Sequence, residues 1–303
     1  MNVFVGITDK EWFDLLSKQN SVHEVNFWQP SGNIQFRALE PGELFLFKLH
    51  SPYDFIVGGG IFAHSSILPI SLAWEAFGLA NGAVSLLDMR FRVEKYRRQP
   101  EDRISDYPIG CILLEEPFFL PKELWIPVPN DWKSNIVRGR RYDVSTQPGI
   151  SLWKSVEEVM QYSISVREES PRYGTEQVIL PRLGQGSFRV LVTDAYARRC
   201  AISKERTLPA LDAAHIKPFS ENGPHEVNNG LLLRRDIHAL FDQGYITISP
   251  TYSIEVSKRI KEEFENGRDY YQYHGKSINF PQRNEFFPSH DYLDWHNLNI
   301  YKG

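Results

Sequence analysis

Residues 211–245 constrain the fold of this 303-residue chain more than any other stretch. The stretch reads LDAAHIKPFSENGPHEVNNGLLLRRDIHALFDQGY. A short apolar run at 211–216 ends before Pro218, which cannot donate a ladder hydrogen bond, and a second run at 231–233 follows a turn-rich segment. From Asp236, a plausible N-cap, apolar residues recur at helical spacing. The pattern predicts a β-hairpin followed by a helix.

Three polar side chains fall on this predicted unit. His215 ends the first strand, Asn229 precedes the second, and His238 lies in the first turn of the helix. The combination resembles the HNH, or ββα-metal, endonuclease family. The likeness extends outward to GQGSFRVLVTDAYARRCAIS at 184–203, which is similar to the lead-in helix of one HNH subfamily.

The resemblance implies hydrolysis of a phosphodiester with a divalent metal ion, Mg²⁺ or Mn²⁺. His215 would then be the general base, because imidazole titrates near neutral pH. Asn229 would hold the loop, or would hold His215 in the productive tautomer. His238 would bind the metal through a neutral ring nitrogen.

The sequence departs from the family pattern at the metal ligand. Many members carry an acidic or histidine ligand immediately before the general base, where this chain has Ala214. We expect Asp212, on the same strand face as Ala214, to supply the missing ligand, with Asp242 as the second choice. The chain has only two cysteines, Cys111 and Cys200, so a structural zinc site with four cysteine ligands is not expected.

Residues 1–145 contain several short strands separated by turns, among them VNFWQPSG, GELFLFKLHS and DFIVGGGIFAHS. These segments resemble the EVE domain of the PUA, YTH and SRA-like group, which implies an open β-barrel with helices and a pocket for a flipped, modified base. The expected pocket residues are Trp28, His50, Ser51, Tyr53 and Trp74. Tryptophans in a small barrel are more often simply core, and this alternative stays open.

The predicted architecture is α+β with two domains. A helical linker at 146–177 joins the EVE-like domain to an HNH domain with a C-terminal extension at 178–303. The second domain carries arginines suited to bind DNA phosphates as planar bidentate donors: Arg182, Arg189, Arg198 and Arg199. The last two of these could equally cap the C-terminus of their helix.

The remaining basic segments and histidines carry weaker signals. Basic residues interleaved with aromatics at 90–98 and 138–141 favour a nucleic-acid face, although such runs are usually solvated surface. His23, His64 and His225 show no partner pattern and are expected at the surface or in loops. Residues 270–303 hold three more histidines among many aromatics and are expected to pack on the nuclease core.

Composition bounds the setting of the protein. No run of eighteen apolar residues occurs and the N-terminus lacks a basic segment, so neither a membrane span nor a signal peptide is expected. Two distant cysteines fit a reducing, cytoplasmic location. The net charge of -4 does not favour DNA binding, but a local basic face can still bind phosphate.

Together these features resemble the EVE-HNH modification-dependent restriction enzymes. The resemblance implies a type IV-like endonuclease that reads 5-hydroxymethylcytosine or 5-methylcytosine in double-stranded DNA by base flipping, with phage DNA as its target. One HNH site cuts one strand, so a homodimer is expected. The alternative is a non-catalytic reader of modified DNA or RNA with a degenerate HNH domain, which Ala214 favours.

Overall fold

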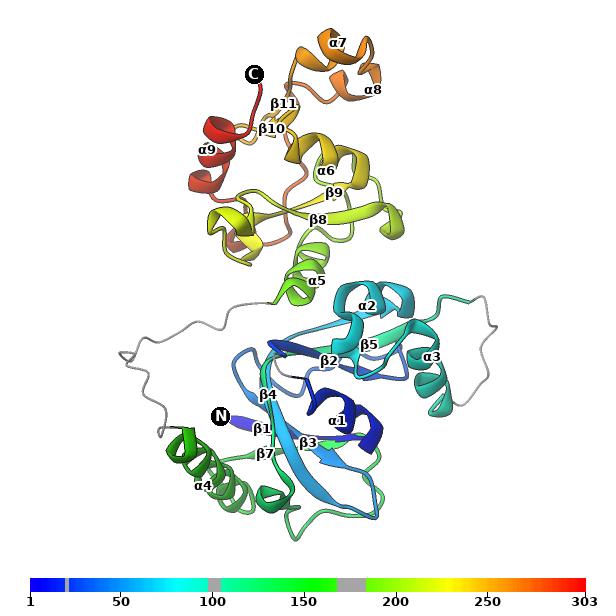
Figure 1. Cartoon of the computed structure of the whole chain (residues 1–303), viewed down its shortest axis with the longest axis vertical. Helices are drawn as coiled ribbons and strands as arrows, with labels where there is room; N and C mark the ends of the chain where they lie inside the picture. Colours follow the sequence, from blue (N-terminus) through cyan, green and yellow to red (C-terminus); the bar gives the residue numbers. More distant parts are fainter. Residues whose placement is uncertain (20–21, 98–104, 168–183) are drawn as a thin grey trace. The chain divides into compact units, whose positions relative to one another are not determined.

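The computed structural model describes residues 1–19, 22–97, 105–167 and 184–303. The chain divides into two compact units, Met1–Pro181 and Arg182–Gly303, and each is described here by itself. Figure 1 shows a mixed sheet with helices in the first unit and a smaller α+β arrangement in the second. The α+β class predicted from the sequence is confirmed.

The first unit is built on a mixed sheet in which the strand order is β2-β5-β4-β3-β1-β7, with β6 pairing β4. Among the described strands of this sheet, β1 and β3 are the one pair that runs parallel. Within the described residues the edge strands β2 and β7 do not pair with each other, so the sheet is open and no closed barrel forms. The strands are β1 (Asn2–Thr8), β2 (Glu24–Gln29), β3 (Leu44–Leu49), β4 (Phe55–Pro69), β5 (Pro108–Phe119), β6 (Ile126–Pro127) and β7 (Gly139–Asp143).

Side-chain alternation along these strands separates two apolar layers. On β3, Phe45 and Phe47 enter an aromatic cluster with Trp12 of helix α1 (Lys10–Leu16). Leu44 and Leu46 enter the opposite cluster. The other helical elements of this unit are α2 (Ile70–Phe77), η1 (Gly78–Asn81), α3 (Leu86–Lys95), η2 (Lys122–Leu124) and α4 (Gly149–Arg167).

Helix α4 belongs to the core of the first unit. Its Leu152 and Val156 are buried in the same cluster as Val3 and Val5 of β1. The sequence predicts a helical linker at 146–177, and within the described part of that segment α4 is a helix that packs on the sheet. Packing against β1 removes the apolar side chains of α4 from water, which a linker free in solution would leave exposed.

The second unit has one hydrophobic core, to which the hairpin β8–β9 and the segments before and after it in the sequence contribute side chains. Phe188 precedes the hairpin, and Ile278 and Leu293 follow it, so the C-terminal extension packs on the same core as expected. The elements are α5 (Gln185–Ala195), η3 (Leu208–Ala210), β8 (Leu211–His215), η4 (Phe219–Glu221), η5 (Val227–Asn229), β9 (Gly230–Arg234), α6 (Arg235–Asp242), β10 (Ile246–Ile248), β11 (Ile254–Val256), α7 (Arg259–Phe264), α8 (Arg268–Tyr271), η6 (Asn284–Phe286) and α9 (His290–Asn299).

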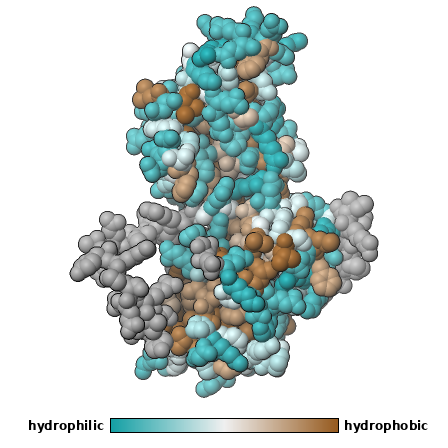
Figure 2. Space-filling model, in the orientation of Figure 1, coloured by the Kyte–Doolittle hydropathy of each residue, from teal (hydrophilic) through white to brown (hydrophobic). Residues whose placement is uncertain are grey.

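Surface hydropathy differs between regions of the chain. Figure 2 shows a largely hydrophilic surface interrupted by brown hydrophobic patches on the first unit. The exposed large apolar side chains of η1, α3 and the turn between them are Leu79, Val84, Leu87 and Phe91. No single helix within the described ranges is long and apolar enough to span a membrane; the pair Ile70–Asn81 and Leu86–Lys95 passes by length and composition only, with a 97° bend.

Candidate active site

The hairpin and helix predicted from the local pattern are present. β8 and β9 pair antiparallel, with Leu211 opposite Arg234 and His215 opposite Gly230. Helix α6 (Arg235–Asp242) begins two residues earlier than the predicted N-cap implies, with Arg234 in place of Asp236 as the N-cap residue. Asp236 is not the cap, because its carboxylate instead accepts two hydrogen bonds from the Arg234 guanidinium, at 2.6 and 2.7 Å.

His238 lies between two carboxylates. Its Nδ1 is 3.6 Å from Asp212 Oδ2 on β8, and its Nε2 is 3.3 Å from Asp242 Oδ2, one turn further along α6. The other oxygen of Asp212 is 3.6 Å from Nε of Arg189 on α5. Four side chains therefore form a single charged cluster: β8 and α5 contribute one each, and α6 contributes His238 and Asp242.

The charges in this cluster stabilise each other. Burial alone would lower the pKa of His238, but the carboxylates of Asp212 and Asp242 raise it to about 9. Burial would raise the pKa of Asp212, but His238 and Arg189 hold it below its ordinary value. The two carboxylates thus favour a positive charge at the position of the His238 ring, and a metal ion bound to this ring would take the place of its proton.

The donor types suit a divalent metal ion, because carboxylate oxygen is a common ligand of Mg²⁺ and Mn²⁺ and imidazole nitrogen is a common ligand of transition-metal ions. Among the described residues, however, no group of three His, Cys, Asp or Glu side chains is arranged to hold a metal. Asp212 and Asp242 face opposite ring nitrogens of His238. In this arrangement one ion could be bound by His238 and Asp212, or by His238 and Asp242, but not by all three side chains.

His215 occupies a half-buried position beside this cluster. Its ring stacks on Phe188 of α5, with centroids 3.9 Å apart and an interplanar angle of 11°. Its Nε2 is 2.9 Å from Nδ1 of His225. Burial, together with the nearby His225 and His238 rings, lowers the pKa of His215 to about 4. The imidazole is therefore neutral at neutral pH and retains one unprotonated nitrogen.

His225 is the functional candidate that sequence reasoning missed. It was expected at the surface or in a loop because the sequence shows no partner pattern for it; it does lie in the loop between η4 and η5, but it has partners there. The ring contacts His215 and also stacks on Phe219, with centroids 4.8 Å apart. Only the path of the loop brings 225 back to 215, and the single signal in the sequence is a histidine inside the HNH segment.

Asn229 holds the loop rather than the His215 ring. Its Oδ1 accepts a hydrogen bond from the Lys217 N–H at 2.9 Å. Its Nδ2 donates to the carbonyls of Lys217 at 3.0 Å and Pro224 at 2.9 Å. The residue is completely buried. Of the two roles expected for this carboxamide, these bonds are those of a loop clamp.

The arginines expected to contact phosphate lie in different settings. Arg189 points toward Asp212, as described above. Arg198 pairs with Asp194 of α5, Nε to Oδ1 3.5 Å, and Arg199 is exposed beyond the helix end. Arg182 lies outside the described residues.

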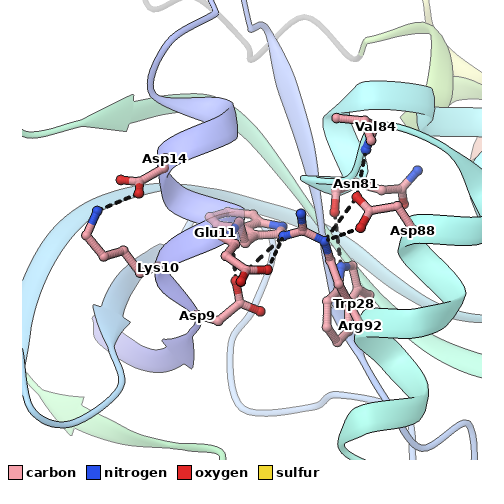
Figure 3. Close-up of polar contacts among 10 residues, drawn as sticks. Asp9, Lys10, Glu11, Asp14, Trp28, Asn81, Val84, Asp88 and Arg92 are labelled. Atoms are coloured by element: carbon pink, nitrogen blue, oxygen red, sulfur yellow. Dashed lines mark hydrogen bonds and ion pairs between the residues drawn. The ribbon is translucent and has the colours of Figure 1, made fainter.

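In the first unit, Trp28 lies on strand β2 and not in a turn. Its Nε1 donates to the carbonyl of Asn81 at 3.0 Å, a contact drawn in Figure 3. Tyr96 links it to His50: the Tyr96 centroid is 6.5 Å from Trp28 and 5.9 Å from His50, with the last two rings nearly parallel. Burial lowers the pKa of His50, so this aromatic group carries a neutral imidazole near neutral pH.

The other expected pocket residues are less closely connected. Ser51 follows His50 in an exposed turn, and Tyr53 is 41% exposed with its ring edge-on to Trp125. Trp74 lies on α2, and no ring contact among the described residues joins it to Trp28 or His50. The structure thus brings two of the five expected residues together, through Tyr96.

Two arginines of the basic segment at 90–98 bind groups of their own unit, and Arg98 lies outside the described residues. Figure 3 shows the Arg92 guanidinium between Asp88, Glu11 and Asp9, with Nε 3.0 Å from Asp88 Oδ1. Arg97 donates to the carbonyls of Pro30 and Pro108. The expected nucleic-acid face at 90–98 is therefore corrected for these two arginines, which tie α3 and its C-terminal end to the rest of the unit.

A hairpin and helix that carry His, Asn and His around a half-buried charged cluster define the ββα arrangement of HNH nucleases. Residues 200–249 match the family described as HNH endonuclease. The second unit thus contains an HNH endonuclease domain.

Among solved structures, the chain is similar to one titled "Modification dependent TagI restriction endonuclease" at 11% identity. The alignment covers 98% of this chain and 81% of that one, with a TM-score of 0.28. No curated protein matches the chain.

Proposed function

We propose that this protein is a divalent-metal-dependent DNA endonuclease that restricts DNA carrying modified cytosine. The observation that carries the nuclease assignment is the pairing of a neutral, half-buried His215 with the charged cluster at His238, inside a segment that matches the HNH family. A general base beside carboxylate and imidazole groups that can bind a metal ion is what metal-dependent hydrolysis of a phosphodiester requires.

The proposed reaction uses the chain's residues in distinct roles. His215 takes a proton from water, the hydroxide oxygen bonds to phosphorus, and the phosphorus–oxygen bond to the leaving alkoxide breaks as that oxygen gains a proton from solvent. Asp212 and His238 hold the metal ion, with Asp242 as the second candidate. The ion, Mg²⁺ or Mn²⁺, supplies Lewis-acid stabilisation of the charge that develops on phosphate.

Selection of modified DNA is assigned to the first unit. The aromatic group of Trp28, Tyr96 and His50 offers ring faces and a neutral imidazole, which suit a base that has lost its stacking partners. We assign 5-hydroxymethylcytosine or 5-methylcytosine in double-stranded DNA as the mark, read by base flipping in an EVE-like fold. A cytoplasmic homodimer would place two HNH sites on the two strands.

A second function is favoured by one residue. Ala214 is completely buried and cannot supply the ligand that many HNH nucleases carry before the general base. If neither Asp212 nor Asp242 replaces that ligand, the protein would be a non-catalytic reader of modified DNA or RNA. The two functions differ in whether the phosphodiester is cut.

The test uses plasmids that contain cytosine, 5-methylcytosine or 5-hydroxymethylcytosine, incubated with the full chain in Mg²⁺, Mn²⁺ or a chelator. We expect metal-dependent cleavage of modified plasmid only, and loss of cleavage in His215→Ala with binding retained. Binding without cleavage in every metal would establish the reader instead. Equal cleavage of all three plasmids would leave a nuclease but remove the modification dependence.

A further inference from the structure

The contact between His215 and His225 imposes a choice of proton position. The two imidazole nitrogens are 2.9 Å apart, so one donates a hydrogen and the other accepts it. If His225 Nδ1 carried this hydrogen, His215 Nε2 would be the acceptor and its Nδ1 would be protonated. If His215 Nε2 carries it, the Nδ1 lone pair of His215 is open to accept another proton.

We propose that His225 is a positioning residue for the general base: its Nδ1 accepts the hydrogen of His215 Nε2 and thereby keeps Nδ1 of His215 unprotonated. This inference rests on the proposed nuclease function, in which His215 takes the proton of water. The tautomer of a histidine is set by the hydrogen bond that its other nitrogen makes. His225 would also stabilise the imidazolium that forms when His215 is protonated, because Nε2 then remains a charged donor to His225.

The structure fixes His225 from both sides. Phe219 stacks on one face of its ring, with an interplanar angle of 9°. Asn229 donates to the carbonyl of Pro224, the residue immediately before His225. The buried carboxamide therefore sets the position of the second imidazole through one peptide unit. Asn229 therefore acts on the general base His215 indirectly, because it holds the peptide that carries His225.

His215 itself is fixed independently of His225. Its ring lies flat on Phe188, which belongs to α5 and not to the loop. Loss of the His225 acceptor would therefore leave the His215 ring in place and change only its tautomer population. A purely structural role for His225 would change stability instead, so the two roles can be separated.

The experiment compares His225→Phe, which keeps an aromatic ring against Phe219 but removes the acceptor, with His225→Asn, whose Oδ1 can accept in place of Nδ1. His290→Phe serves as the matched control, because His290 is an exposed histidine of the same unit. The first readout is the ¹⁵N imidazole spectrum of the full chain, with the His215 signals identified by their loss in His215→Gln. The second is hydrolysis of bis(p-nitrophenyl) phosphate with Mn²⁺, which requires no base recognition.

We expect His215 to be the Nε2–H tautomer in the wild type and in His225→Asn, and a mixture in His225→Phe. We expect kcat to fall about 10- to 100-fold in His225→Phe, the range typical for groups that orient a functional side chain, with melting temperature unchanged. His225→Asn should recover most of this loss.

A wild-type His215 protonated on Nδ1, or a tautomer that His225→Phe does not alter, would overturn the proposal. The spectrum is recorded without substrate, so it decides the role of His225 even if the wild type hydrolyses nothing. A wild type that hydrolyses no phosphodiester in either metal would overturn the proposed nuclease function and not the role of His225.

Discussion

Asn229 satisfies both backbone polar groups of Lys217: its Oδ1 accepts from the Lys217 N–H at 2.9 Å and its Nδ2 donates to the Lys217 carbonyl at 3.0 Å. A third bond to Pro224 closes the loop from its other end. Because the side chain is completely buried, water cannot replace these bonds when the carboxamide is lost. The geometry of the loop beside His215 therefore depends on a single side chain.

Replacement of Asn229 by Ala should impair both stability and cleavage. Buried backbone groups left without partners cost about 1–3 kcal/mol each, so we expect unfolding of the second unit at lower urea concentration. Asn299→Ala, which removes an exposed amide that donates to Trp295, is the control and should change stability by less than about 0.5 kcal/mol. Urea unfolding with an unchanged midpoint in Asn229→Ala would contradict the loop clamp.

The choice between the two carboxylates at His238 can be settled by metal binding. We expect Asp212→Asn to weaken Mn²⁺ binding about 10-fold or more and Asp242→Asn to weaken it less, because Asp242 is more exposed to water. Isothermal titration with Mn²⁺ measures both. Asp236→Asn, which removes the partner of Arg234 on the same helix, is the control. The reverse order of affinities would assign the ligand to Asp242.

His296 should make the stability of the second unit fall in mild acid. Its ring stacks on Phe241, its Nε2 donates to the Phe241 carbonyl, and its Nδ1 accepts from Thr247. Burial lowers its pKa to about 4, whereas the unfolded chain has an ordinary value near 6.5.

The folded state therefore holds His296 neutral, and its contribution is complete above pH 6.5 and is lost as pH falls toward 4. The difference amounts to about 3 kcal/mol across this window. Chemical unfolding of wild type and His296→Gln between pH 4 and 7 measures it, and equal pH slopes in the two proteins would exclude this assignment.

Glu115 should act in the opposite direction in the first unit. The side chain is 1% exposed, and one of its oxygens has no hydrogen-bond partner. Burial and the charges of Glu24 and Glu116 raise its pKa to about 7. The folded state keeps this proton to a higher pH than the unfolded chain does, so stability is lost as pH rises from about 4.5 to 7.

Glu115→Gln should therefore stabilise the first unit at pH 8, by at most about 3 kcal/mol, and should have little effect at pH 4. Glu123→Gln, at an exposed position of the same unit, is the control. Thermal unfolding at both pH values measures the change. A Glu115→Gln protein that is less stable than the wild type at pH 8 would show that the carboxylate has a charged partner.

The aromatic group in the first unit makes a prediction about selectivity. Trp28→Ala removes a ring face beside Tyr96, so we expect the preference for hydroxymethylated over unmodified DNA to fall about 10-fold, because stacking of a base on an aromatic ring contributes about 1–3 kcal/mol. Fluorescence anisotropy with matched duplexes measures it. Trp153→Ala on α4 is the control, and an unchanged preference in Trp28→Ala would remove this residue from the pocket.

Much of the HNH unit could be predicted because its signals are local. The hairpin and α6 follow from apolar periodicity over about thirty residues, and the spacing of His215, Asn229 and His238 is fixed by those elements. The first unit was predicted only as short strands with helices. The parallel pairing of β1 with β3 joins residues about forty positions apart, and alternation within a strand does not specify its neighbour.

By itself the sequence determined the elements of this protein, the alternation that divides its strands between two layers, and the three polar residues of the HNH segment. Tertiary structure alone decided that His225 meets His215, that Asp212 and Asp242 face opposite nitrogens of His238, and that Arg92 is bound within its own unit. Periodicity encodes which face of an element is buried. Contacts between side chains on different elements depend on how loops and packed layers bring those faces together, and no local pattern records that geometry.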